Sequence, residues 1–181
     1  MRSPASVLKR VEETEMVQAA RLGDSNAFAW LYSRYARMVH GILLSRVPRD
    51  EVDDLVQEVF LSVYRRLHTL RDAAAFGGWL AQITRNRAHD FLRHNPETAE
   101  LREDHAVAGP NPEEADARRA LEAVQSLPGA YRETLILRLV EGMSGEEIAA
   151  RTGLSPGSVR VNLHRGMKLL REKLGEGKAH A

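Results

Sequence analysis

Apolar residues recur along this chain at spacings of three and four, which is the spacing that places side chains on one face of an α-helix. Because no run alternates as a strand does, the pattern predicts an all-α protein. Glycine and proline stand where the expected helices should begin or end. These helices cover about residues 13–22, 25–47, 49–70, 74–93, 115–127, 129–141, 144–152 and 156–174.

The helical pattern breaks between the fourth and fifth expected helices. Residues 95–116 hold three prolines, and residues 96–116 carry seven acidic side chains against one basic side chain. Such a composition predicts a flexible acidic linker. We therefore expect two small helical domains, residues 1–94 and 117–181. The blocks on either side of the linker are mildly basic, which favours contact with a polyanion, whereas the linker itself should be repelled by DNA.

Composition excludes several classes of protein. Apolar residues make up 43% of the chain and charged residues 28%, as in ordinary globular domains. The charged N-terminal segment does not resemble a signal peptide, and no apolar run approaches the roughly 18–20 residues that span a bilayer. We therefore expect a cytoplasmic protein without membrane insertion. With no cysteine and seven scattered histidines, we expect no metal and no cofactor. The sequence offers no nucleophile–base pair and no P-loop, so we expect no enzyme.

The strongest local signal lies between residues 144 and 174. Ser144 and Glu147 form an S-x-x-E capping box, Gly153 suits the left-handed position after a helix, and Pro156 suits the first position of the next one. This spacing predicts a helix-turn-helix whose second helix enters a DNA major groove. That helix is basic and is capped by Ser155. The candidates for reading bases are Ser158, Arg160, Val161 and Asn162, and those for holding phosphates are Arg165, Lys168 and Arg171. The alternative is a solvated basic helix in an ordinary bundle, which the two caps and the tight turn disfavour.

The third expected helix has a core face and a second, mixed face. Its apolar stripe comprises Val52, Leu55, Val56, Val59, Phe60, Val63, Leu67 and Leu70. The opposite face gathers Asp54, Gln57, Glu58, Leu61 and Arg65. A solvated surface is the simplest interpretation of that face. However, an apolar Leu61 among acidic side chains, in an otherwise basic domain, suits the docking of a basic partner helix.

The fourth expected helix combines aromatic and basic residues. Its apolar face holds Phe76, Trp79, Leu80, Ile83 and Phe91, which also suits an ordinary aromatic core. Its polar side supplies Arg85, Asn86, Arg87, Arg93 and His94, which suit phosphates or exposed bases. The preceding loop, about residues 68–75 with Arg71, is a weaker candidate for holding an unstacked base.

Three segments together resemble a bacterial RNA polymerase sigma factor of the extracytoplasmic-function (ECF) group. DEVDDLVQEVFLSVYRRL is similar to the helix that docks on the clamp helices of the polymerase β′ subunit. AFGGWLAQITRNRAHDFLRH is similar to the helix beside the −10 recognition loop, and residues 127–174 are similar to region 4, which reads the −35 element. Both family domains are covered in order.

The resemblance implies a role for each matched position. It assigns polymerase binding to Asp54, Leu55, Gln57, Glu58 and Leu61. It assigns the −10 side to Trp79, Arg85, Asn86, Asp90 and Arg93, with a flipped base held by the loop at about residues 67–75. We add Arg71 of that loop and Arg87 as basic candidates on the same side. It matches Arg160 to the usual arginine at the start of the recognition helix. With the candidates from the helix-turn-helix pattern, we expect the −35 side to comprise Ser155, Ser158, Arg160, Val161, Asn162, Arg165 and Lys168. The implied partners are core RNA polymerase (β′ clamp helices and β flap), promoter DNA and an anti-sigma factor.

The chain departs from the family pattern at two places. Val161 and Asn162 stand where Ser-Arg is usual, so the −35 sequence that is read should differ. Arg87 and His89 replace residues that are often apolar. Two other classes remain open at this point. One is a helix-turn-helix regulator that binds duplex DNA without polymerase, for which the acidic face of the third helix would have no use. The other is a sigma-like adaptor that no longer reads DNA, against which Arg160 and Arg165 argue.

Overall fold

The computed structural model describes residues 4–96 and 112–176, and within these ranges it is helical with no strand, as the pattern predicted. The acidic segment at residues 97–111, expected to be flexible, lies outside the described residues. The helices of the described part are α1 (Pro4–Arg21), α2 (Ser25–Leu44), α3 (Val52–Arg66), α4 (Phe76–His94), α6 (Pro112–Gln125), α7 (Gly129–Leu139), α8 (Gly145–Thr152) and α9 (Pro156–Glu176).

The expected helices are present, but several of their ends differ. Helix α1 begins earlier than expected, at Pro4, and α6 begins at Pro112. The region expected as one helix over residues 49–70 is a 3₁₀ turn, then α3, then a second 3₁₀ turn. Helix α2 stops at Leu44 because the chain must leave the helical conformation before Pro48, and the Ser45 hydroxyl donates to the carbonyl of Ile42 at 2.7 Å.

Helix α2 is the centre of the first group of helices, where α1, α3 and α4 all pack against it. The side chains predicted for the apolar stripe of α3 are all buried. Phe76, at the start of α4, meets Tyr35 of α2 in an edge-to-face contact with ring centroids 5.1 Å apart. The Tyr35 hydroxyl donates to Glu13 of α1 at 2.5 Å, so three helices are fixed at one point.

Helix α7 is the centre of the second group, with α6, α8 and α9 around it. The capping box forms as predicted: the Ser144 hydroxyl accepts from the Glu147 N–H at 3.1 Å, and the Glu147 carboxylate accepts from the Ser144 N–H at 2.9 Å. Gly153 has φ +76°, the left-handed conformation that the sequence predicted. The helix-turn-helix is therefore confirmed as a local structure.

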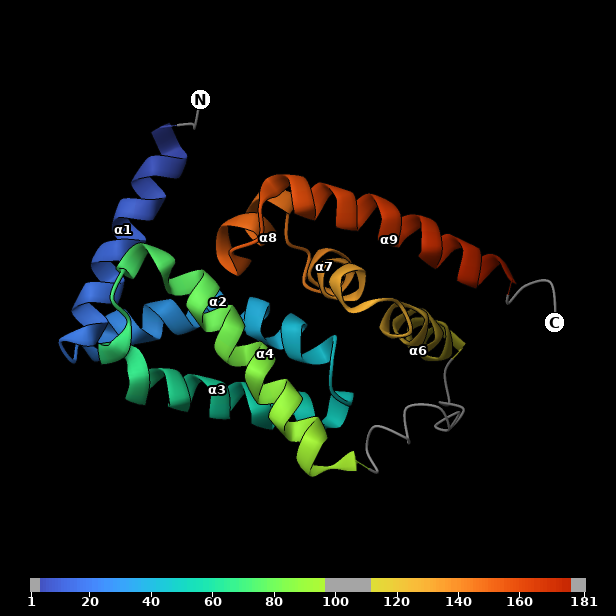
Figure 1. Ribbon diagram of the computed structural model, residues 1–181, viewed down its shortest axis with the longest axis horizontal. Helices are drawn as coiled ribbons and strands as arrows, with labels where there is room; N and C mark the ends of the chain where they lie inside the picture. The colour runs from blue at the N-terminus through green and yellow to red at the C-terminus, as the bar shows by residue number, and fades with distance from the viewer. Residues whose placement is uncertain (1–3, 97–111, 177–181) are drawn as a thin grey trace.

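The two groups of helices pack directly against each other. Helix α7 lies along α2, and α8 lies against α4, whose first turn faces the turn of the helix-turn-helix (Figure 1). Glycines allow this close approach. A Cβ atom on Gly77 would lie 2.6 Å from the carbonyl oxygen of Arg151, and one on Gly41 would lie 2.7 Å from the Leu137 side chain. At Gly77 the two backbones are therefore in contact, and at Gly41 side chains of α7 pack onto the α2 backbone, where a larger residue would hold the two groups apart.

Replacing Gly77 with alanine should weaken this packing, because the added methyl group meets a backbone carbonyl that cannot move aside. We expect Gly77→Ala to lower the free energy of unfolding by about 1–3 kcal/mol, the usual cost of overpacking. Gly78→Ala is the matched control, since its Cβ would lie at an ordinary 3.6 Å from Gly153 and it gains the same helix propensity. Urea denaturation of both variants measures the difference, and equal midpoints would contradict the prediction.

Candidate nucleic-acid interface

The first turn of α9 presents its predicted base-reading side chains to solvent. The Ser155 hydroxyl caps the helix by accepting from the Ser158 N–H at 3.0 Å, so both serines are fixed at the helix start. Arg160 is exposed and Val161 is 45% exposed, whereas the side chain of Val159 points into the core and is buried. Among the predicted reading residues, Ser158, Arg160 and Val161 are therefore exposed to solvent, and Asn162 is half-buried.

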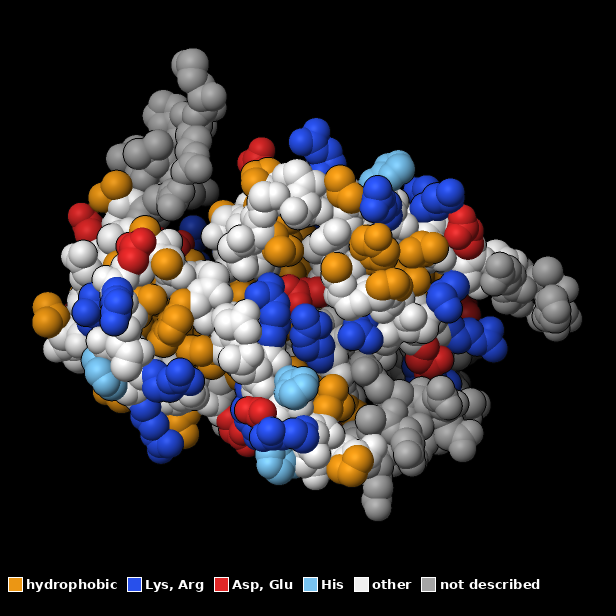
Figure 2. Space-filling model, viewed as in Figure 1, with side chains coloured by type: hydrophobic (Ala, Val, Ile, Leu, Met, Phe, Trp, Pro, Cys, Tyr) orange, Lys and Arg blue, Asp and Glu red, His pale blue; other side chains and the backbone are white. Residues whose placement is uncertain are grey.

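Basic side chains continue along the outer side of α9. Figure 2 shows lysine and arginine side chains over this helix around an apolar patch. A shallow hollow there is lined by Leu163, His164, Met167, Lys168 and Arg171. Arg165 is exposed, and Lys168 lies 3.9 Å from Glu172, close enough for a weak surface ion pair. The predicted phosphate-holding residues therefore follow the reading residues along one edge.

The mixed face of α3 is exposed, but one of the residues predicted for polymerase binding lies outside it. Asp54 and Gln57 are exposed, and Leu61 is 50% exposed. Leu55, also predicted for partner binding, is only 2% exposed because it belongs to the apolar stripe, so its side chain packs in the core and does not face a partner. Glu58 is exposed and pairs with Arg87 of α4, its carboxylate accepting from the Arg87 Nε at 2.6 Å.

The predicted residues of α4 do not form one open surface. Asn86 is exposed and accepts from Gln82, and Arg93 lies 3.5 Å from Asp90. Trp79 is half-buried, with its ring centroid 6.2 Å from that of Phe76. Arg71 is exposed and lies in the loop that precedes α4, not on the helix itself.

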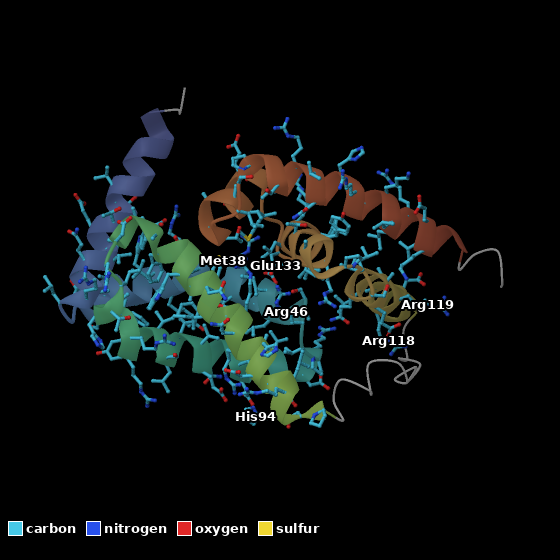
Figure 3. The ribbon with its side chains drawn as sticks, viewed as in Figure 1. Met38, Arg46, His94, Arg118, Arg119 and Glu133 are labelled. Atoms are coloured by element: carbon cyan, nitrogen blue, oxygen red, sulfur yellow. The ribbon has the colours of Figure 1, made fainter. Side chains whose placement is uncertain are left out.

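Arg85 differs from the other predicted residues because it is bound to the second group of helices. Its guanidinium donates to both carboxylate oxygens of Glu133 on α7, at 2.7 and 3.1 Å. Arg46, in the turn after α2, donates to the same carboxylate at 2.6 Å. Figure 3 shows Arg46 and Glu133 next to each other at the boundary between the groups. Burial lowers the pKa of Arg46, although the Glu133 carboxylate beside it favours the charged form.

Two further contacts cross the same boundary. His40 of α2 lies 2.6 Å from Glu141, measured from Nδ1 to Oε1, and the Gln125 side chain donates to the carbonyl of Leu44 at 2.8 Å. The hydrogen bond to Glu141 raises the pKa of His40, against the opposite effect of burial. Asp53 and Arg49 also act on His40, the first raising and the second lowering its pKa.

The sequence interpretation missed this boundary entirely. One signal was available: Leu135, Ile136 and Leu137 are consecutive apolar residues, and all three are fully buried. Three consecutive positions span about 200° of a helix at 100° per residue, so a helix that buries all of them needs cover on more than one side. The α7 pattern therefore indicates two packing partners, although it does not identify α2 as the second.

Comparison with known proteins identifies both groups of helices. The family model described as "Sigma-70 region 2" matches residues 31–97, and the one described as "Sigma-70, region 4" matches residues 117–170. RNA polymerase sigma factor CarQ of Myxococcus xanthus is 40% identical over 163 residues, covering 86% of this chain and 94% of CarQ. The ECF RNA polymerase sigma-E factor of Haemophilus influenzae is 30% identical over 183 residues, covering 92% and 97%.

Solved structures show the same fold. CnrH, solved in complex with the cytosolic domain of CnrY, superposes with a TM-score of 0.64 at 24% identity, covering 91% of this chain and 97% of that one. The sigma factor RpoE of Bartonella quintana, solved with the anti-sigma factor NepR, gives a TM-score of 0.52 at 24% identity, covering 80% and 93%. Among the helices described here, none combines the length and the apolar content that crossing a membrane requires.

The His40–Glu141 contact predicts how stability depends on pH. Because the pKa of His40 is raised in the folded protein, its stabilising contribution is complete below the ordinary value of 6.5 and is lost as pH rises through the raised value. His40→Gln should therefore lower the melting temperature most at about pH 6 and least at about pH 9. His89→Gln, at an exposed position on α4, is the control. A His40→Gln difference that is constant with pH would contradict the prediction.

Proposed function

The chain belongs to the ECF group of sigma-70 factors, which direct promoter-specific initiation by bacterial RNA polymerase, and we propose that it divides this task among three surfaces. These are the outer face of α3 for core polymerase, α4 with its preceding loop for the −10 element, and the first half of α9 for the −35 element. The observation that carries this assignment is that an acidic face with a central leucine and a capped basic helix are both exposed, on separate groups of helices.

The polymerase surface comprises Asp54, Gln57, Glu58 and Leu61. Exposed carboxylates around an apolar side chain suit the β′ clamp helices if these present basic residues around an apolar contact. The surface lies outside the contacts between the two groups of helices, so it is accessible while they are packed together. Region 4 provides a second contact, with the β flap.

The −10 surface comprises Arg71, Trp79, Arg85, Asn86, Arg87 and Arg93. Capturing a flipped base costs unstacking energy, which contacts to the loop at residues 67–75 and to these cations would offset. The −35 surface comprises Ser155, Ser158, Arg160, Val161, Asn162, Arg165 and Lys168. Arg160 is the main reader, since an exposed arginine can bind a guanine edge with two hydrogen bonds.

Residues 1–94 form the first domain in this proposal, residues 95–116 the linker, and residues 117–181 the second domain. Sigma factors are not catalytic enzymes, and we assign this chain no enzymatic activity of its own. It acts in the cytoplasm, where it meets polymerase, and an anti-sigma factor holds it inactive. The Bartonella relative, solved with such a partner, supports this last assignment. Transcription with core polymerase on a pool of promoter fragments tests the whole proposal, since only specific initiation agrees with it.

Charge reversal on the α3 face tests polymerase docking. We expect Asp54→Lys with Glu58→Lys to abolish binding to core polymerase, because like charges would then face each other. Neither side chain is buried, so the fold should be retained, apart from the loss of the Glu58–Arg87 ion pair. Glu15→Lys, at an exposed position on α1, is the control for adding a positive charge elsewhere. Co-elution with core polymerase is the measurement, and full affinity in the double variant would disprove the assignment.

Replacement of Arg160 tests the −35 assignment. We expect Arg160→Ala to weaken binding to the preferred −35 duplex by about 1–3 kcal/mol, the range for one bidentate base contact. Arg171→Ala, in the same helix, is the comparison: it should weaken binding to all duplexes equally, as the loss of a phosphate contact does. Fluorescence anisotropy with preferred and scrambled duplexes separates the two patterns. An equal loss on both duplexes for Arg160→Ala would show that Arg160 holds phosphate only.

A further inference from the structure

Two arginines of the first domain converge on one carboxylate of the second. Arg46 donates to Glu133 at 2.6 Å, and Arg85 donates to it at 2.7 and 3.1 Å. The Glu133 side chain is 5% exposed, while those of Arg46 and Arg85 are 21% and 23% exposed. A buried carboxylate must be compensated by charge or hydrogen bonds, and here both of its partners come from the other domain.

The pair of arginines also requires an anion. Two guanidinium groups share a single negative charge, and Arg85 opposes the charged form of Arg46, adding to the larger effect of burial in lowering the pKa of Arg46. If the domains separate, Glu133 leaves with α7 and the two cations remain side by side on the first domain. A carboxylate and a phosphate diester each present two oxygens to an arginine fork, so either can occupy the same position.

We propose that Arg46 and Arg85 form a binding site for a backbone phosphate of promoter DNA, and that Glu133 occupies this site while the two domains are packed together. The proposal rests on the assignment of α4 to the −10 side and adds Arg46, which no sequence motif marked. Glu133 acts here as an internal substitute for phosphate. DNA binding at this site and closure of the domains are therefore mutually exclusive.

Removing the carboxylate tests both parts of this proposal without polymerase. The chain has no cysteine, so Leu22→Cys and Lys173→Cys, both at exposed positions, accept a dye pair that reports the distance between domains. We expect Glu133→Gln to lower the energy transfer between the dyes. It should also raise affinity for an oligonucleotide carrying the −10 strand by roughly tenfold, because the Glu133 carboxylate no longer competes with phosphate for the two arginines.

Arg46 is tested in the Glu133→Gln background, where closure is weakened. Adding Arg46→Ala should cancel the gain in affinity and reduce the slope of log affinity against log salt by about 1, as expected for one lost phosphate contact. Adding Arg49→Ala instead, at an exposed position nearby, should change both quantities less. Equal losses for Arg46→Ala and Arg49→Ala would overturn the phosphate site, and unchanged energy transfer in Glu133→Gln would overturn the latch.

A second variant covers the case in which Glu133→Gln does not fold. Arg46→Gln in the otherwise unchanged chain leaves Glu133 paired with Arg85, so the fold should persist. We expect lower energy transfer together with lower DNA affinity, because Arg46 serves both states. Higher affinity would show that Arg46 is only a latch residue and would overturn the site. If the polymerase assignment were wrong, the energy transfer and DNA affinity would still change as expected here, but transcription with core polymerase would show no specific initiation.

Discussion

The buried carboxylate of Glu133 is the interaction on which the closed arrangement depends. Its side chain is only 5% exposed, and it accepts hydrogen bonds from Arg46 and Arg85 of the other domain, which compensate its charge. Removing one partner of such a buried pair leaves an uncompensated charge, which typically costs about 3–5 kcal/mol. The relative position of the two domains therefore depends on this cluster, on the His40–Glu141 and Gln125–Leu44 contacts, and on the close approach at Gly41 and Gly77.

Closure affects the three proposed surfaces differently. The acidic face of α3 remains exposed, and so do Ser158 and Arg160 at the start of α9. Arg85, by contrast, is engaged by the other domain. Under the proposed assignments, a protein closed in this way can meet polymerase while part of the −10 surface is occupied. If docking on polymerase separates the domains, the order of events would be polymerase first and −10 DNA second.

The sequence predicted much of the fold because local rules determine it. The capping box at Ser144, the left-handed Gly153 and the apolar stripe of α3 depend on neighbours within a few residues, and the structure has all of them. The boundary between domains could not be predicted in the same way. Glu133 and Arg46 are far apart in sequence, and no periodic pattern around either residue predicts that they pair. Leu55 shows a second limit of sequence-based prediction: a residue that matches a functional motif can still have its side chain in the core.

The run of Leu135, Ile136 and Leu137 gives the open protein a property that the closed one lacks. Leu137 lies against Gly41 of the other domain, so separating the domains uncovers apolar surface that water then has to solvate, at about 25 cal/mol for each Å². An open molecule without a partner would present this apolar surface to chaperones and proteases. If the domains open in the cell, the lifetime of the free protein would therefore depend on how quickly a partner covers that surface.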